Sequence, residues 1–512
     1  MPTHAPSNLI GDDAHEIPGD GLVSRNPARP DEIVWSGSPS VDHVGRAVEA
    51  AREAQGAWWS MGEAKRIEAL RAYQAIVGER VGEIAALITR ETGKALWDSK
   101  AEAGILAGKV DITLDAMAGM GFSRTRGYEV SVGETRKGVC HFRPHGVMAV
   151  VGPFNFPAHL PNGHIVPALL MGNAVVFKPS DKTPAVGQML AEMLREAVVS
   201  VGGPAGVVNL VQGGAEVAKP LVAHGGVDGV LFTGSWPVGR EILRANLDSP
   251  GRIVALELGG NNPALVMSDC DFKQAVVECA RASFITTGQR CTCTRRIIVH
   301  EAIAEKFIAA LVELAKRVTV GDPLAEGTSI GPLVAGSARE AVLKFQNSAQ
   351  SAGGRSLLEC AASDGGTGGF YISPGVMEID LFTSTTDATK DAGCDEEVFG
   401  PLVRVSRCSS YEDGLAQANA TRYGLASSIF TGDDALACRF LGEARAGCVN
   451  VNTGTAGASG KLPFGGLGLS GNHRPAGAFS ADYCAYPVAS MVETGGAAAG
   501  IPGMAVDDSL FA

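Results

Sequence analysis

Several features that mark membrane or secreted proteins are missing from this sequence. No apolar run reaches the ~18 residues that a membrane-spanning helix needs, and the longest apolar stretch, residues 165–177, is interrupted by Pro167, Gly172 and Asn173. Residues 1–20 are polar and acidic, without the basic segment and apolar stretch of a secretory signal. We therefore expect a soluble, cytoplasmic protein with no membrane partner.

Basic charge and metal-binding cysteine patterns are also scarce. The chain carries 43 Lys and Arg against 55 Asp and Glu, and this acidic balance argues against a nucleic-acid partner. The 11 cysteines show no repeated C-x-x-C spacing, and the close pair Cys291 and Cys293 has no second half with which to form a zinc site. We expect no metal, and thiols kept reduced as in a cytoplasm. The 66 glycines follow no period, which excludes collagen.

Hydrophobic patterning predicts an α/β fold with two doubly wound parallel sheets. Residues 41–120 repeat apolar residues at helical spacing. After them, apolar runs alternate with helical patterns, first at residues 147–151, 174–177, 207–211, 229–232 and 253–256, then near residues 264–267, 296–299, 402–405 and 428–430. Such alternation is typical of parallel strands covered by helices on both faces. Residues 128–139 alternate among charged residues and predict an exposed β arm.

Two residues are candidates for catalysis. Cys291 ends a Gly-Gln-Arg-Cys turn, and its neighbour Arg290 would favour a reactive thiolate. Glu257 ends an apolar strand, at the sheet edge where sites form in open α/β folds. Partial burial there would raise its pKa and suit a general base. Each pattern also fits a structural role, as an inert buried cysteine or a solvated glutamate.

Three loops that follow strands of the first sheet are candidates for ligand binding. Residues 152–157 present Asn155, whose amide can donate to an oxyanion. Lys178 can reach ribose or phosphate oxygens, and residues 234–239 begin a helix whose N–H groups suit a pyrophosphate. Each also fits ordinary turn chemistry. Residues 466–471 match G-x-G-x-x-G, but no clear strand precedes them, so we interpret them as a loop rather than a dinucleotide-binding motif.

Together these motifs closely resemble the aldehyde dehydrogenase superfamily over residues 22–493. The resemblance rests on seven segments in the family's order, at residues 152–157, 177–180, 232–235, 257–260, 288–291, 396–401 and 463–466. Within the superfamily, the chain resembles the N-succinylglutamate 5-semialdehyde dehydrogenases of arginine catabolism, at residues 159–167, 258–263, 289–293, 470–475 and 481–485. It departs from them at residues 450–455, in a loop that borders the superfamily's substrate tunnel, where a usual Trp and Lys are missing.

The resemblance implies a reaction mechanism. Cys291 attacks the aldehyde carbon as a thiolate, and the Asn155 amide and the Cys291 backbone N–H hold the oxyanion. Hydride transfer to a nicotinamide leaves a thioester. Glu257 activates the water that hydrolyses this thioester and helps to deprotonate the thiol. The implied substrate is N-succinyl-L-glutamate 5-semialdehyde and the product N-succinyl-L-glutamate.

The resemblance also implies a nicotinamide cofactor site. Its expected residues are Phe154, Lys178, Ser180, Asp181, Gly234, Ser235, Gly239, Gly259, Glu397 and Phe399. Lys178 and Glu397 would hydrogen-bond the riboses, and Phe399 would lie against the nicotinamide. Asp181 replaces a usual Glu near the adenine ribose, where an acidic group accepts from a 2′-hydroxyl and repels a 2′-phosphate. NAD is therefore favoured, and NADP is tolerated because Asp is shorter.

A substrate with carboxylates requires cationic groups in its tunnel. We expect Arg290, Arg474 and His159 to supply them, with His473 as an alternative, because guanidinium groups bind carboxylates through two hydrogen bonds. Each of these residues also fits a structural role. Cys293 is expected to be a bystander, since a disulfide across two residues would be strained.

The resemblance divides the chain into domains. Residues 1–121 and 144–256 would form a Rossmann-like NAD-binding domain, 257–460 the catalytic domain, 122–143 and 476–493 an oligomerisation arm, and 494–512 a tail. An arm with unpaired strand edges needs a partner subunit. We expect a homodimer or a homotetramer.

Three alternatives stay open at this point. A dehydrogenase for another aldehyde would keep the same mechanism. A CoA-acylating enzyme would resolve the thioester with CoA, but such relatives typically lack a base like Glu257. A non-catalytic member would keep the fold alone, and the intact set of Cys291, Glu257, Asn155 and Lys178 argues against it.

Overall fold

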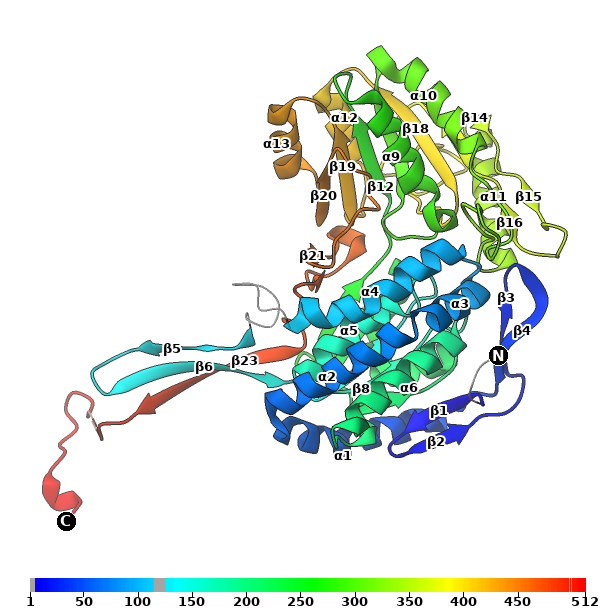
Figure 1. Cartoon of the computed structure of the whole chain (residues 1–512). Coiled ribbons are helices and arrows are strands. Elements are labelled where there is room, and N and C mark those ends of the chain that lie inside the picture. Colours follow the sequence, from blue (N-terminus) through cyan, green and yellow to red (C-terminus); the bar gives the residue numbers. More distant parts are fainter. Residues whose placement is uncertain (1–4, 115–124, 497, 499) are drawn as a thin grey trace.

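The computed structural model describes residues 5–114, 125–496, 498 and 500–512. Two α/β bodies lie against each other, and a long three-stranded arm extends from the first of them (Figure 1). This arrangement confirms the predicted fold class. Within the described residues, the longest apolar helical segments are too short or too polar to cross a membrane.

The first body is built on a seven-stranded sheet of order β11-β10-β7-β8-β9-β1-β2. Its parallel strands are β7 (Val147–Val151), β8 (Ala174–Lys178), β9 (Val208–Leu210), β10 (Gly229–Thr233) and β11 (Ile253–Glu257). Nearly all of their residues are buried, as expected for strands covered on both faces. The antiparallel edge strands β1 (Ser7–Ile10) and β2 (Asp13–Glu16) were not predicted, because they are short and β2 is polar and mostly exposed.

Helices cover this sheet on both faces. One core joins the sheet to α2 (Gly62–Glu79), α3 (Val81–Thr92), α4 (Leu96–Leu114), α5 (His159–Leu170) and α6 (Pro184–Ser200). The opposite core joins it to α1 (Asp42–Ser60), α7 (Ala215–Ala223) and α8 (Trp236–Ala245). Helices α1 to α4 confirm the helical periodicity predicted within residues 41–120, of which residues 115–120 lie outside the described part. The strands β3 (Leu22–Asn26) and β4 (Arg29–Gly37) form a separate hairpin, whose Val34 and Trp35 pack into the first of these cores.

The second body repeats this architecture in a sheet of order β14-β17-β18-β13-β12-β19-β20. Its strands are β12 (Asn262–Val266), β13 (Thr294–His300), β14 (Arg355–Leu358), β17 (Gly375–Glu378), β18 (Leu402–Cys408), β19 (Ala426–Phe430) and β20 (Cys448–Val451). All neighbours pair in parallel except β14 and β17. Helices α9 (Phe272–Phe284) and α10 (Glu301–Lys316) pack on one face, and α11 (Gly336–Ser351), α12 (Tyr411–Ala418) and α13 (Asp434–Glu443) on the other.

The arm is an antiparallel sheet of order β23-β6-β5. It consists of β5 (Tyr128–Ser131), β6 (Arg136–Pro144) and β23 (Ala485–Glu493), and its outer strand β5 is exposed throughout. The predicted exposed β arm is thereby confirmed, although residues 122–124 lie outside the described part. The domain boundaries and the oligomerisation role of the arm stay predictions. Two short ladders complete the fold, β15 (Ala362–Ser363) with β16 (Tyr371–Ile372) and β21 (Pro463–Phe464) with β22 (Ala476–Gly477).

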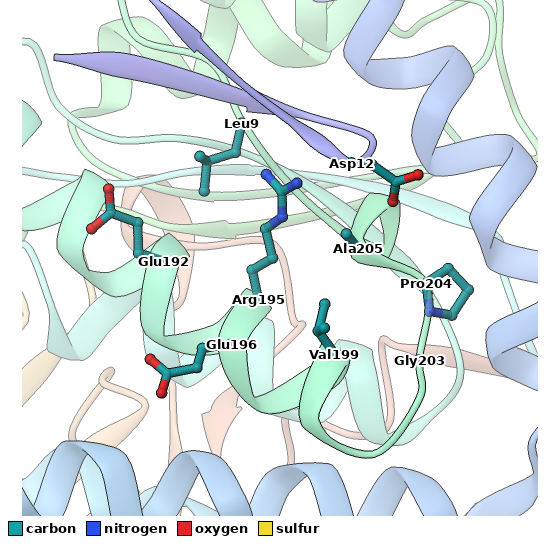
Figure 2. Close-up of a pocket in the computed structure, with 9 residues that line it drawn as sticks. All are labelled: Leu9, Asp12, Glu192, Arg195, Glu196, Val199, Gly203, Pro204 and Ala205. Atoms are coloured by element: carbon teal, nitrogen blue, oxygen red, sulfur yellow. The ribbon is translucent and has the colours of Figure 1, made fainter. Parts of the chain in front are cut away.

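An open pocket of about 520 Å³ lies between the β1–β2 hairpin and α6. Figure 2 shows its lining, in which Arg195 projects from α6 towards the hairpin between the acidic side chains of Asp12 and Glu192. The guanidinium of Arg195 donates a hydrogen bond to the backbone oxygen of Asp13 at 3.0 Å. None of the residues expected to act in catalysis or cofactor binding lines this pocket.

Candidate active site

Cys291 lies in a strained loop between α9 and β13. Thr286 and Thr287 have φ values of +56° and +55°, in the left-handed region that residues with a side chain rarely adopt. Gly288 follows with φ +71°, and a Cβ atom there would lie 2.1 Å from the backbone oxygen of Gly400. Hydrogen bonds hold this conformation, from Thr286 Oγ1 to Asp98 at 2.5 Å and from Thr287 Oγ1 to the Gly331 oxygen at 2.9 Å.

Arg290, the residue directly before Cys291, is paired with a carboxylate. Its guanidinium forms an ion pair with the buried Asp98 of α4, at 2.7 Å, and also donates to Thr286 Oγ1. The charge that lowers the pKa of the Cys291 thiol is that of Arg295. Arg295 is thus the cation with the larger effect on this thiol, and the effect expected of Arg290, which is paired with Asp98, stays a prediction.

The surroundings of Cys291 favour the protonated thiol. Burial and the carboxylates of Glu397 and Glu257 raise its pKa to about 12, and the opposing effect of Arg295 is smaller. The thiol therefore needs a base to become a nucleophile at neutral pH. A carboxylate that contributes to the raised pKa, that of Glu257, is also the candidate for this base.

Glu257 ends β11 and is buried. Within the described residues its carboxylate oxygens have no side-chain hydrogen-bond partner. Burial raises its pKa well above the ordinary value, and the nearby backbone N–H of Ala476 opposes this rise only in part. The segment at residues 466–471 contacts the chain directly after this strand, where Leu258 N donates a hydrogen bond to the Ser470 oxygen at 3.0 Å. That segment is a loop with a short 3-10 turn, which confirms that its G-x-G-x-x-G pattern is not a dinucleotide-binding motif.

Asn155 follows β7 in the loop that leads to α5 and is buried. Its side-chain amide donates one hydrogen bond to the backbone oxygen of Gln289, at 3.0 Å, and so faces the loop that carries Cys291. An amide has two hydrogens, so the oxyanion role expected of Asn155 stays a prediction that this hydrogen bond leaves open.

A cavity of about 460 Å³ brings the catalytic candidates together. Its lining includes Cys291, Glu257, Arg290 and His159, together with apolar side chains of α4, α5 and a loop that ends near β21. Arg474 does not reach it. That residue is exposed, lines a neighbouring hollow of about 220 Å³ with His473, and donates to the His473 oxygen. Arg474 is not among the residues that line the cavity of Cys291, and the substrate-binding role expected of it stays a prediction.

Half of the expected cofactor residues line a separate pocket of about 430 Å³. Phe154, Ser180 and Asp181 of the first body face residues of the second body across it, including Glu397 and Phe399. The rings of Phe154 and Phe399 meet edge to face, with centroids 5.9 Å apart. The residues thus form an aromatic and acidic cleft next to Cys291.

The remaining cofactor candidates lie near the strand ends of the first sheet. Lys178 is buried and donates to the backbone oxygens of Pro179 and Gly213, at 2.5 and 2.6 Å, and burial lowers its pKa to about 8. Gly234 and Ser235 precede α8, whose first turn has no side-chain cap, so its N–H groups remain available to an anion.

Two glycines at this edge allow close approaches that fit a cofactor cleft. A Cβ atom at Gly259 would lie 1.9 Å from one carboxylate oxygen of Glu397, and the other oxygen of this carboxylate accepts a hydrogen bond from Gly260 N at 3.0 Å. A Cβ atom at Gly239, in the first turn of α8, would contact Leu258 at 2.8 Å. An uncapped helix start, a glycine-bordered edge and an aromatic cleft are the features that a dinucleotide needs.

The polar face of α4 is the part of the site that sequence reasoning missed. Asp98, Glu102 and Lys109 are all buried on it. Glu102 pairs with the buried Lys94 at 2.5 Å and accepts hydrogen bonds from Ala158 N and His159 N, so it caps α5 directly after the Asn155 loop. The sequence does contain a signal for this face. Asp98, Glu102 and Lys109 are spaced by four and seven residues, which places three charged side chains on one side of a helix among apolar neighbours.

Comparison with known proteins agrees with this geometry. The model of the aldehyde dehydrogenase family matches residues 18–487. An N-succinylglutamate 5-semialdehyde dehydrogenase 2 from Caulobacter vibrioides is 46% identical over 479 residues, covering 92% of this chain and 93% of that protein. An N-succinylglutamate 5-semialdehyde dehydrogenase from Chromobacterium violaceum is 41% identical, covering 92% and 94%.

Solved structures of similar fold cover the whole architecture. A betaine aldehyde dehydrogenase from Staphylococcus aureus in complex with NAD⁺ has a TM-score of 0.88 and 27% identity, with 97% of this chain and 96% of that one covered. A glyceraldehyde-3-phosphate dehydrogenase from Methanocaldococcus jannaschii complexed with NADP has a TM-score of 0.85 and 28% identity, with 93% and 100% covered. The chain belongs to the aldehyde dehydrogenase family.

Proposed function

We propose that this chain oxidises N-succinyl-L-glutamate 5-semialdehyde to N-succinyl-L-glutamate, with Cys291 as nucleophile and Glu257 as base. The observation that carries the proposal is the shared cavity, which is lined by the partly buried Cys291, by the buried carboxylate of Glu257 without a side-chain partner, and by cationic side chains. The names of the relatives at 41% and 46% identity support the same substrate.

The chain's own residues account for each proton movement. Glu257 removes the proton of the Cys291 thiol, and the sulfur adds to the aldehyde carbon to give a thiohemiacetal whose oxygen Asn155 stabilises by donating a hydrogen bond. Bound NAD supplies the acceptor for the hydride that leaves this carbon. Glu257 passes the thiol proton on to solvent and is ionised again. It then takes a proton from water, the water oxygen attacks the thioester, and the carbon–sulfur bond breaks to release a carboxylate and the Cys291 thiolate.

We infer that NAD is the preferred cofactor and that NADP is tolerated. In the acidic and aromatic cleft, Phe154 and Phe399 would flank the nicotinamide side, and Glu397 and Lys178 would hydrogen-bond the riboses. The carboxylate of Asp181 at the same cleft would accept from a ribose 2′-hydroxyl and repel a 2′-phosphate. Gly234, Ser235 and Gly239 at the start of α8 would hold the pyrophosphate.

The departure at residues 450–455 is compatible with the same substrate. Thr455 is buried behind the catalytic loop, where its hydroxyl donates to the Thr292 oxygen at 2.7 Å, and Thr453 bonds to Glu278. The cavity lining from this segment begins only at Ala456. The positions that differ from the related dehydrogenases therefore lie outside the cavity wall.

We also propose that the arm joins subunits into a homodimer or a homotetramer. Its exposed apolar side chains, Tyr128, Val130, Tyr486 and Met491, need cover, and β5 offers an unpaired edge. Light scattering at micromolar concentration tests this, since a monomer would contradict it.

All eleven cysteines are free thiols, which supports a reducing, cytoplasmic setting.

Initial rates of reduced nicotinamide formation test the proposed substrate. We expect the highest kcat/KM with N-succinylglutamate semialdehyde and NAD, lower values with succinate semialdehyde and with NADP, and the lowest values with aliphatic aldehydes such as propanal. Faster turnover of another aldehyde would reassign the substrate while leaving Cys291 and Glu257 in their roles. A rate that requires added CoA would instead support the acylating alternative.

A further inference from the structure

Lys109 is a buried lysine in the wall of the Cys291 cavity that the reaction itself does not use. It lies on α4 with 4% of its surface exposed. Its ammonium donates to the backbone oxygen of Gly477 at 2.8 Å and to Ser480 Oγ at 2.7 Å. In the described part of the chain, no Asp or Glu forms an ion pair with it.

This lack of a counter-charge distinguishes Lys109 from its neighbour Lys94. Lys94 is equally buried but pairs with Glu102 at 2.5 Å. An ammonium buried without a carboxylate costs several kcal/mol, and burial accordingly lowers the pKa of Lys109 to about 8. The group is still mainly protonated at pH 7, so the cavity wall carries an uncompensated positive charge.

His159 provides a second, independent sign of a missing ligand in the same cavity. Its Nδ1 atom is buried and has no hydrogen-bond partner in the described structure. Burial, together with the charges of Lys109, Lys94 and Arg290, lowers its pKa to about 4, so the ring is neutral at pH 7. A neutral imidazole can donate one N–H to an anion without adding to the charge of the site.

Arg290, the cation that the sequence favoured for this purpose, is less available. Its guanidinium is paired with Asp98 at 2.7 Å and stacks near the ring of Phe156, 5.0 Å from the ring centroid. An anionic substrate would have to compete with a buried carboxylate for it. Lys109 has no such competitor.

We propose that Lys109, assisted by His159, binds a carboxylate of the substrate remote from its aldehyde group. This assignment rests on the proposed function, since it assumes an aldehyde that carries such a carboxylate. The apolar walls contributed by Ile105, Ile112 and Leu160 suit the chain that links the two ends of the substrate. The carboxylate would supply the counter-charge that the buried ammonium lacks.

The variant Lys109→Met tests this by removing the charge while keeping the length of the side chain. We expect kcat/KM for succinate semialdehyde and for N-succinylglutamate semialdehyde to fall roughly 10- to 100-fold, mainly through KM, as for the loss of one charge-assisted hydrogen bond. The kcat/KM for propanal should stay within about twofold. Ser480→Ala is the matched control, because it removes one hydrogen bond of Lys109 and leaves the charge.

A variant on the accessible side of the same helix covers the case in which Lys109→Met does not fold. Ile105 lies one turn before Lys109, lines the cavity and is 46% exposed. Ile105→Glu would place a carboxylate beside the ammonium, and we expect a larger loss with anionic aldehydes than with propanal. Ile105→Gln, which adds polarity without charge, should affect anionic and neutral aldehydes equally.

The outcomes separate this assignment from the proposed function. Equal losses with propanal and with the anionic aldehydes would make Lys109 a purely structural support for residues 477–480. Unchanged kinetics in Lys109→Met, or in Ile105→Glu if only that variant folds, would also overturn the assignment while leaving the dehydrogenase reaction intact. If wild-type protein oxidised no aldehyde at all, the proposed function itself would fail.

Discussion

The carboxylate of Asp98 on α4 lies 2.7 Å from the guanidinium of Arg290, the residue directly before Cys291. The other carboxylate oxygen accepts from Thr286 Oγ1, whose backbone is in the left-handed region. One buried carboxylate thus fixes both ends of the loop that presents the nucleophile. The same helix fixes the oxyanion loop through Glu102, so α4 positions the catalytic parts relative to each other.

Asp98→Asn should lower kcat roughly 10- to 100-fold, because an amide keeps the shape but cannot neutralise Arg290, and small displacements of a nucleophile are costly. Steady-state kinetics with a saturating aldehyde measure this. Asp111→Asn is the matched control, since Asp111 lies on the same helix but pairs at the surface with Arg71. Equal, small effects of the two variants would contradict a positioning role for Asp98.

Glu102→Gln should reduce the free energy of unfolding by about 3–5 kcal/mol, because it leaves the Lys94 ammonium buried without a partner. Chemical denaturation followed by fluorescence measures the change. Glu68→Gln removes the partner of an exposed lysine, Lys65, and should cost less than about 1 kcal/mol. If both variants lost the same stability, burial of the Lys94–Glu102 pair would not be what makes it matter.

The rate of thioester hydrolysis should fall as pH decreases. Burial raises the pKa of Glu257 well above its usual value. Only the ionised carboxylate can accept a proton from water, so at a pH below this raised pKa most of the enzyme lacks the base. The rate should therefore rise with pH through this raised pKa and level off above it. Rapid-mixing measurements of deacylation at several pH values test the prediction, and a flat profile between pH 5 and 8 would exclude Glu257 as the base.

The sequence predicted the features that depend on local pattern. Buried parallel strands read as continuous apolar runs, and the residues at their ends, such as Glu257 and Asn155, were found because sites form at the carboxyl edge of such sheets. The motif order then connected these residues to one family. The antiparallel strands β1 and β2 were not predicted, because a strand of four residues is too short to show a clear hydrophobic pattern.

Pairings across long sequence separations could not be predicted from local pattern. Arg290 was expected to act on Cys291 because the two are adjacent in sequence, but its charge is balanced by Asp98, 192 residues away. Arg474 was expected in the tunnel on the basis of its charge, whereas in the structure it lines a neighbouring hollow that it shares with Glu257. Lys109 was overlooked because a single lysine in a helix is usually solvated.

The variant Glu257→Gln shows whether Cys291 forms a thioester that Glu257 hydrolyses. On rapid mixing with NAD and succinate semialdehyde, we expect about one equivalent of reduced nicotinamide per active site, formed more slowly than in the wild type because thiol deprotonation is also impaired, and then turnover slowed roughly 100-fold or more. Mass spectrometry should find the acyl group on Cys291. Steady turnover at the wild-type rate, without a burst and without acylated Cys291, would contradict the mechanism.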